Sequence, residues 1–250
     1  MANALITGAS SGIGLSTARR LIGRGQRVLL LSYDEPELLQ ACSELGSGAV
    51  PVLCDLTLPD QVDGLWQRLE EQHGPIEILI NNAGVGYHAE VAEIDLAVVR
   101  RLFEVNFFAA ASLCAQAMRV MKARRRGHIL NLTSAAARRS LPFIGAYGAS
   151  KAALHALTQS LRLEASGTGV TVCEVLPISV RTPFFDRAGY RPRGFTQTPD
   201  QVAEQILRCL DLGQAERTTH WPTALGFALD ALLPNWVAKL LAWRYRRPRP

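Results

Sequence analysis

The stretch ALITGASSGIG, from Ala4 to Gly14, is the clearest structural signal in this 250-residue chain. Ala4–Thr7 is apolar enough for a short buried strand, and residues 15–22 have the apolar spacing of a helix. The glycines between them permit a tight turn and let backbone amides approach a pyrophosphate, to which the helix start adds partial positive charge. Three residues separate Gly8 from Gly12, whereas the most common dinucleotide fingerprint has one. Alone, the loop is also compatible with an ordinary glycine-rich connection.

The rest of the chain alternates between short apolar runs and stretches of helical periodicity. The runs lie at 28–31, 49–53, 76–80, 128–132 and 170–175. Such runs are typical of buried parallel strands, which right-handed crossovers arrange as a doubly wound sheet of the Rossmann type. At 48% hydrophobic residues, the chain can bury one α/β core. We place this single domain at residues 1–220, with 221–250 as its carboxyl-terminal extension.

A second motif carries the chemistry. Tyr147 and Lys151 belong to the sequence YGASK, and Ser134 lies thirteen residues upstream of the tyrosine. Periodicity predicts a helix over 146–166, which puts Tyr147 and Lys151 on one face. Lowering a tyrosine pKa from about 10 to near 7 takes roughly 4 kcal/mol, which a fixed cation beside the phenol can largely supply. We therefore expect Tyr147 to act as a general acid or base on a carbonyl or alcohol. The alternative is a solvated surface pair.

These motifs, in their order and spacing, resemble the short-chain dehydrogenase/reductase family from residue 3 to residue 212. The turn at 81–84 and the segment at 177–182 follow the family pattern, except that Ile178 stands where glycine is usual. The resemblance implies an oxidoreductase that transfers hydride between NAD(P)(H) and a carbonyl or secondary alcohol. The implied catalytic residues are Asn106, Ser134, Tyr147 and Lys151.

The resemblance also implies a role for each of these groups. Ser134 would hold the substrate oxygen, Tyr147 would protonate it, Lys151 would lower the tyrosine pKa and bind the nicotinamide ribose, and Asn106 would hold a relay water. Ser134 as a strand-end turn residue and Asn106 as a backbone-bonded helix amide are the alternatives. No metal is expected. The expected cofactor-binding residues are Gly8, Ser10, Ser11, Gly12, Ile13, Gly14, Ser32, Tyr33, Asp34, Asp55, Leu56, Asn82, Ala83, Gly84, Tyr147, Lys151, Pro177, Val180 and Thr182.

The choice between the two nicotinamide cofactors depends on the end of the second strand. Asp34 is placed to hold a ribose 2′-hydroxyl, as in NAD-binding chains. By family alignment, however, the discriminating acid would fall on Ser32 and the phosphate-binding arginine on Tyr33. Hydroxyls at Ser11, Ser32 and Tyr33 can bond a 2′-phosphate, and no carboxylate at 32 or 33 repels it. The sequence therefore favours NADP slightly over NAD.

Two apolar segments are expected to flank the substrate. Residues 141–144 read LPFI, and residues 183–195 contain several aromatic side chains in a loop rich in Pro, Gly and Arg. They predict a hydrophobic substrate, such as a steroid, a retinoid or a fatty-chain compound. The alternative, equally compatible, is that these aromatic residues only pack the loop onto the body.

The extension at 221–250 is rich in Leu and Trp and ends in arginines 244, 246, 247 and 249. Polar residues and Pro234 interrupt it, so we do not predict a membrane-spanning helix. We favour an extension packed on the substrate loop or across a subunit interface. An amphipathic helix on a membrane surface is the alternative.

Charge and cysteine usage limit the remaining classes of function. Five cysteines without C-x-x-C spacing, and a strand close to Met1, predict a reduced cytoplasmic protein. A net charge of +5 permits nucleic-acid binding through 124–126, but no aromatic residues interleave with those arginines, so no nucleic-acid partner is expected. A non-catalytic dinucleotide sensor is the other alternative. His155 fits a satisfied helix residue, and the resemblance implies a homodimer or homotetramer built on helices at 96–122 and 147–166.

Overall fold

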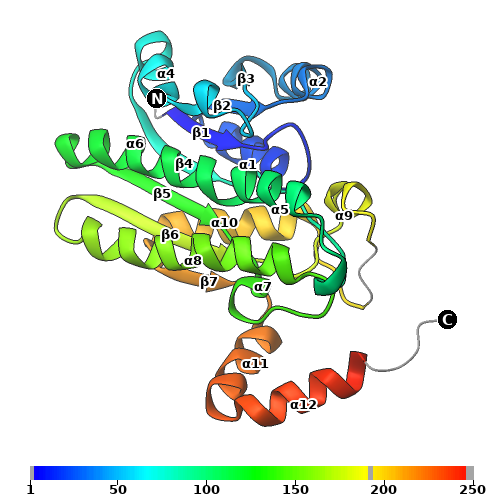
Figure 1. Cartoon of the computed structure of the whole chain (residues 1–250). Helices are drawn as coiled ribbons and strands as arrows, with labels where there is room; N and C mark the ends of the chain where they lie inside the picture. Colours follow the sequence, from blue (N-terminus) through cyan, green and yellow to red (C-terminus); the bar gives the residue numbers. More distant parts are fainter. Residues whose placement is uncertain (1–2, 191–193, 246–250) are drawn as a thin grey trace.

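The computed structural model describes residues 3–190 and 194–245, and within them seven parallel strands form one sheet in the order β3-β2-β1-β4-β5-β6-β7 (Figure 1). The six predicted strands are confirmed, each end within one residue of its prediction, whereas β7 was not predicted because it is a short, polar edge strand. The strands are β1 (Asn3–Thr7), β2 (Arg27–Ser32), β3 (Ala49–Leu53), β4 (Ile76–Asn81), β5 (Gly127–Leu132), β6 (Val170–Leu176) and β7 (Glu216–Thr218).

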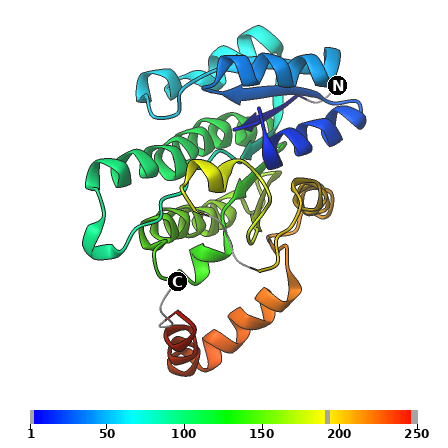
Figure 2. The ribbon, with the colours of Figure 1, turned by 90° about the vertical axis from the view of Figure 1, so that its right-hand side faces the viewer.

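Helices cover both faces of the sheet, as Figures 1 and 2 show. Alternating side chains of β1 belong to opposite cores, with Ala4 and Ile6 in one and Leu5 in the other. The first core includes α1 (Gly12–Gly23), α2 (Glu35–Leu45) and α10 (Pro199–Leu212). The second includes α3 (Pro59–Val62), α4 (Leu65–His73), α6 (Ala109–Arg124) and α8 (Gly145–Ala165). The predicted doubly wound α/β architecture is therefore confirmed.

The helix predicted over 96–122 is present from Leu96 to Arg124, but it is not α-helical throughout. It consists of α5 (Leu96–Phe103), a π-helical turn at Glu104–Phe108, and α6. Asn106 lies in this turn and is 1% exposed. A π turn places an extra residue in the helix, often at a functional site, and apolar spacing alone does not reveal it.

Two helices at the carboxyl terminus, α11 (Trp221–Leu232) and α12 (Pro234–Tyr245), form what we term the C-terminal arm. The arm extends from the body beside the segment that follows β5 (Figures 1 and 2). The Arg139 guanidinium lies 3.5 Å from the Asp230 carboxylate, and Arg138 lies over the Phe227 ring. The exposed large apolar side chains of the C-terminal arm are Trp221, Leu225, Leu229, Leu232, Leu233, Trp236, Leu240 and Trp243.

The arm contacts the region predicted to flank the substrate. A groove between Pro142 and the α12 residues Ala238, Leu241 and Ala242 joins the two. Across the described parts of the chain, every helix is too short or too polar to cross a bilayer. Residues 246, 247 and 249, which complete the predicted basic tail, lie outside the described residues.

Candidate active site

The glycine loop is tied to the end of β4 by a side-chain amide. Asn82 Nδ2 donates to the carbonyl oxygens of Thr7 at 2.8 Å and Gly8 at 2.9 Å. A Cβ at Gly8, where φ is +63°, would lie 2.9 Å from the Ala83 Cα, and one at Gly14 would lie 2.6 Å from Asn82 Nδ2. The two turns approach so closely that only glycine fits. Asn82 and Ala83 thus fix the shape of the predicted cofactor loop.

The amino-terminal end of α1 suits a diphosphate. Ser11 is the N-cap residue, and among the described groups its side chain makes no capping hydrogen bond. The first turn, Gly12–Leu15, contains no acidic residue, so the exposed amides and the helix dipole favour an anion there. Thr182 covers this loop, since a Cβ at Gly12 would lie 3.0 Å from its Cγ2. These features fit the cofactor predicted from the sequence.

The next part of the predicted cofactor site lies at the end of β2. Ser32 Oγ is 3.1 Å from Ser10 Oγ, and both residues are buried. Asp34, expected to hold a ribose hydroxyl, instead caps α2 by accepting from the Glu37 backbone N–H at 3.0 Å. Tyr33 is 61% exposed. The carboxylate beside Ser10 belongs to Glu37, which accepts from the Ser10 hydroxyl at 2.7 Å.

Sequence reasoning missed Glu37 and its ion-pair partner Arg187. The Arg187 guanidinium, on α9 (Phe184–Arg187), lies 3.1 Å from the Glu37 carboxylate. A signal for Glu37 was present in the sequence. An N-cap acid followed three residues later by Glu is the spacing of a capping box, which places Glu37 in the first turn of α2, just after the strand end.

Asp55 and Leu56 follow β3. One Asp55 oxygen accepts hydrogen bonds from the Thr57 backbone N–H at 2.8 Å and the Thr57 hydroxyl at 2.7 Å. This local turn orients the loop, and Leu56 is buried beneath it. The cofactor contact predicted for Asp55 therefore involves a carboxylate whose orientation is already fixed by Thr57.

Ser134 and Tyr147 meet at the carboxyl ends of the central strands. Ser134 caps the short helix α7 (Ala135–Arg138), where its Oγ accepts from the Ala136 N–H at 3.1 Å, so the strand-end role holds as well. Burial raises the pKa of the Tyr147 phenol, and a hydrogen bond with Ser134 partly opposes that increase. The expectation that Lys151 lowers this pKa stays a prediction.

Lys151 lies beneath this pair and is 3% exposed. Its Nζ donates to the Leu132 carbonyl oxygen at 3.0 Å, and burial lowers its pKa from 10.5 to about 8. The backbone at Gly84 passes directly over it, since a Cβ there would lie 3.2 Å from the Lys151 Nζ and 3.2 Å from the Asn106 Oδ1. Lys151, Asn106 and the 81–84 turn therefore converge.

The Asn106 amide fixes the loop after β4. Its Oδ1 accepts from the Val85 N–H at 2.8 Å, and its Nδ2 donates to the Val85 carbonyl oxygen at 3.0 Å and to the Ser150 hydroxyl at 3.0 Å. Ser150 in turn donates to the Tyr147 carbonyl oxygen at 2.8 Å. This is the backbone-bonded amide that the sequence left open as an alternative, and it joins the π turn to the start of α8.

Aromatic rings from three segments line the region in front of Tyr147. The Tyr147 ring centroid lies 5.7 Å from that of Phe184, in an edge-to-face arrangement. His88 stacks between Phe143 and Tyr190, with ring centroids at 5.3 and 4.6 Å. Phe185 links the two groups through edge contacts with Phe184 and Tyr190. The predicted flanking segments are thus brought together by the fold.

Comparison with known proteins agrees with this geometry. Residues 2–191 match the short chain dehydrogenase family. This chain is a member of that family. It is 30% identical to a ketoacyl reductase, HetN, from a Nostoc species, over 96% of this chain and 88% of that protein. It therefore acts as a dehydrogenase or reductase on an alcohol or a carbonyl.

Solved structures of other dehydrogenases have the same fold. A short-chain dehydrogenase from Sphingobium yanoikuyae, in complex with NADPH, is 30% identical with a TM-score of 0.83, covering 94% of this chain and 96% of that one. A Burkholderia phymatum member in complex with NAD is 26% identical with a TM-score of 0.86, covering 93% and 95%. The predicted family and fold are therefore confirmed.

The segment expected beside the nicotinamide in this dehydrogenase is regular despite Ile178. Of the described non-glycine residues, only Arg125 and Phe143 have positive φ, so the path at Ile178 needs no glycine. The Pro177 carbonyl oxygen accepts from the Ala135 N–H at 2.9 Å, which joins the segment to α7. Val180 pairs with Gln197, and Thr182 follows it.

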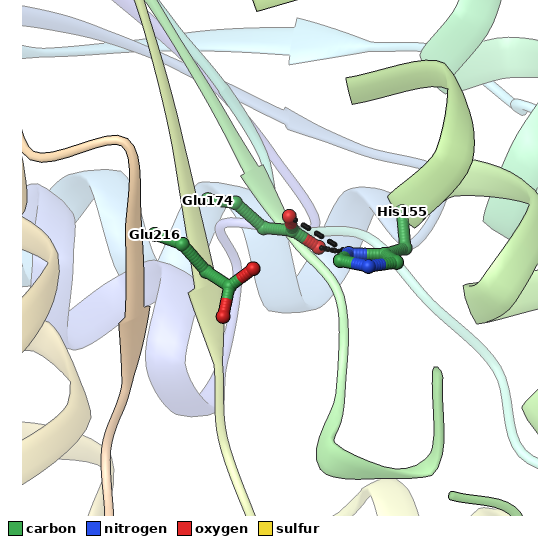
Figure 3. A group of neighbouring side chains, drawn as sticks. All are labelled: His155, Glu174 and Glu216. Atoms are coloured by element: carbon green, nitrogen blue, oxygen red, sulfur yellow. Dashed lines mark hydrogen bonds and ion pairs between the residues drawn. The ribbon is translucent and has the colours of Figure 1, made fainter. Parts of the chain in front are cut away.

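A charged cluster of this dehydrogenase consists of His155, Glu174 and Glu216 (Figure 3). His155 on α8 bonds the fully buried Glu174 on β6 at 2.8 Å, and ligand atoms of these residues and Glu216 on β7 lie within 4.8 Å of one another. Such spacing suits a metal ion, but guanidinium groups already supply positive charge. Arg138 donates to Glu216 at 2.6 Å, and the Arg162 Nη2 lies 3.9 Å from Glu174. We interpret the cluster as a structural ion-pair network, in which His155 is satisfied as predicted.

Proposed function

We propose that this dehydrogenase interconverts a hydrophobic ketone and its secondary alcohol with NAD(P)(H) as cofactor. The observation that carries the proposal is the convergence of Ser134, Tyr147 and Lys151 beside the glycine loop. When bound, the nicotinamide supplies or accepts the hydride. The cofactors found in the two solved relatives, NADPH and NAD, support this class of cofactor.

The side chains manage the proton. The Ser134 hydroxyl holds the substrate oxygen and the Tyr147 phenol donates its proton to it during reduction. With a pKa of about 8, Lys151 remains largely protonated at neutral pH, so its charge stabilises the phenolate left behind. Asn106, whose Oδ1 lies against Gly84 as the Lys151 Nζ does, would hold the water that returns a proton to the site.

The substrate class follows from the aromatic wall. Rings of Phe143, Phe184, Phe185 and Tyr190 surround the approach to Tyr147, and such a surface favours an apolar chain or ring system. The name of the Nostoc relative, a ketoacyl reductase, supports a carbonyl on a fatty chain. A steroid or a retinoid fits the same wall.

The decisive experiment replaces Tyr147 with phenylalanine. The variant should bind NADH and NADPH as the wild type does, while its turnover of a lipophilic ketone falls by at least about a thousandfold. Tyr87→Phe is the matched control, because the Tyr87 hydroxyl accepts from the Asp95 N–H, away from Ser134 and Lys151 in the hydrogen bonds of the described residues. If Tyr147→Phe retained turnover, the proposed mechanism would be wrong. If the wild-type protein bound neither NADH nor NADPH, the proposed enzymatic function would be wrong.

We also propose that the protein forms a homodimer or homotetramer through α6 and α8. The outer faces of these helices border an apolar groove lined by Ala111, Met118 and Leu157, among others. Contact with a second copy would cover this groove. Light scattering at micromolar concentration tests the proposal, and a monomer would overturn it.

The C-terminal arm is proposed to touch the surface of an anionic membrane from the cytoplasmic side. Its exposed Leu and Trp side chains, together with Lys239 and Arg244, suit the headgroup region. The five free cysteines support the reducing compartment. Sedimentation with anionic vesicles should capture the full chain and leave a version ending at Trp221 in solution. Equal capture of both, or of neither, would remove the proposal.

A further inference from the structure

The adenosine end of the site contains a carboxylate that the strand sequence does not reveal. We infer that Glu37 binds the adenosine ribose of the cofactor and makes the enzyme prefer NAD(H) to NADP(H). The inference rests on the proposed function, since it concerns the cofactor of the same site. It reverses the slight preference for NADP, which rested on the absence of a carboxylate at residues 32 and 33.

The geometry places Glu37 among groups that lead to the ribose. The Ser10 hydroxyl, in the glycine loop, donates to the Glu37 Oε2 at 2.7 Å, and Ser10 Oγ lies 3.1 Å from the Ser32 Oγ at the end of β2. The loop binds the pyrophosphate in this fold, and an acid just beyond the second strand bonds the ribose 2′-hydroxyl. Glu37 reaches that position from the first turn of α2.

One oxygen of Asp34 is already used to cap α2, whereas the Glu37 carboxylate reaches the glycine loop. The Asp34 carboxylate accepts from the Glu37 N–H and caps α2, which also holds the Glu37 backbone in place. The Glu37 side chain is 28% exposed, while Ser10 and Ser32 are 6% and 5% exposed. A carboxylate with a free face toward solvent, backed by buried hydroxyls, can accept hydrogen bonds from ribose hydroxyls.

The same carboxylate opposes a 2′-phosphate. Two like charges at hydrogen-bond distance repel each other strongly where water is partly excluded. Arg187 could otherwise bind the phosphate, but its guanidinium lies 3.1 Å from the Glu37 carboxylate. NADPH would therefore have to compete with Glu37 for Arg187, whereas NADH would not. The alternative role for the pair is a latch that only holds α9 against α2.

Fluorescence titration with NADH and NADPH distinguishes these roles. Wild type should bind NADH more tightly, and Glu37→Gln should shift the ratio of the two dissociation constants toward NADPH by at least about tenfold. Combining Glu37→Gln with Arg187→Gln should remove the gain in NADPH binding, because the released guanidinium is its source. Glu35→Gln, an exposed acid in the same helical turn, is the matched control and should leave the ratio unchanged.

The outcomes separate this inference from the proposed function. Binding of both cofactors with a wild-type preference for NADPH would overturn the role of Glu37 and leave the proposed reaction intact. An equal change in both dissociation constants on Glu37→Gln would also overturn it and identify the pair as a latch. Failure of wild type to bind either cofactor would overturn the inference and the proposed function together.

Discussion

Replacing Lys151 with methionine should stabilise the folded protein while it abolishes turnover. Burial lowers the Lys151 pKa from 10.5 to about 8. At about 1.4 kcal/mol per pKa unit, keeping this ammonium charged inside the protein costs roughly 3 kcal/mol near neutral pH. Methionine carries no charge but leaves the Leu132 carbonyl oxygen without its donor, which costs about 1 kcal/mol. The expected net gain in unfolding free energy is roughly 2 kcal/mol.

The pH dependence gives this prediction its sign. Because the folded pKa of Lys151 lies below the unfolded value, the unfolded chain binds more protons between about pH 8 and 10.5, and the stability of the wild type rises with pH in that window. The advantage of Lys151→Met should therefore be largest at and below about pH 7 and shrink toward pH 10.5.

Urea unfolding, followed by tryptophan emission at several pH values, measures both effects. Lys122→Met on α6 is the control, because Lys122 is exposed and its replacement should change stability by less than about 0.5 kcal/mol. A Lys151→Met protein that is less stable than wild type at neutral pH, or whose advantage does not change with pH, would refute the reasoning.

Three other substitutions test the remaining features. Gly14→Ala should lower the melting temperature and weaken cofactor binding, because the added methyl would lie 2.6 Å from Asn82 Nδ2. Gly23→Ala is the control, since no described atom lies within 4 Å of its added methyl, and equal melting shifts of the two variants would contradict the prediction. Phe184→Ala should raise KM for an apolar ketone about tenfold with unchanged cofactor affinity. Phe195, which is 62% exposed, provides the control, and Phe195→Ala should leave KM unchanged. Steady-state kinetics in which neither variant changes KM would show that the aromatic rings do not bind the substrate. Glu174→Gln should cost about 1–3 kcal/mol in a denaturant titration because it removes the buried carboxylate from His155, and an unchanged midpoint would show that the network adds no stability.

Most of the fold could be predicted because buried parallel strands have a simple sequence pattern. The run at 28–31 is apolar on both faces, so its position needs no tertiary information. β7 lacks such a run, and in the sheet it pairs with β6, through Glu174 and Leu176 among others. The π turn was not predicted for a related reason. One inserted residue changes the direction of the Asn106 side chain without changing the apolar composition of the helix.

The sequence predicted where the active-site residues lie better than it predicted their pKa values. Spacing brings Tyr147 and Lys151 to one helix face, but spacing does not show how deeply each lies. The pKa of Tyr147 is raised because burial outweighs the hydrogen bond with Ser134, which only the packed structure reveals. Glu37 was missed because only the residues directly after the strand, Ser32 to Asp34, were considered, whereas the first turn of α2 brings Glu37 to Ser10.

All seven described strands run in the same direction. The active-site residues therefore gather at the carboxyl ends of the strands, and the amino-terminal ends of the strands lie at the opposite edge of the sheet. The turns that enter the strands lie opposite the active site, and at Gly25, Gly46 and Gly167 no described atom lies within 4 Å of an added Cβ. Surface attachment, insertion of a tag or fusion to a second enzyme at these turns would leave the reacting edge facing solvent. Because the sheet is parallel, these turns are attachment points that would orient the enzyme on a support with its active site exposed.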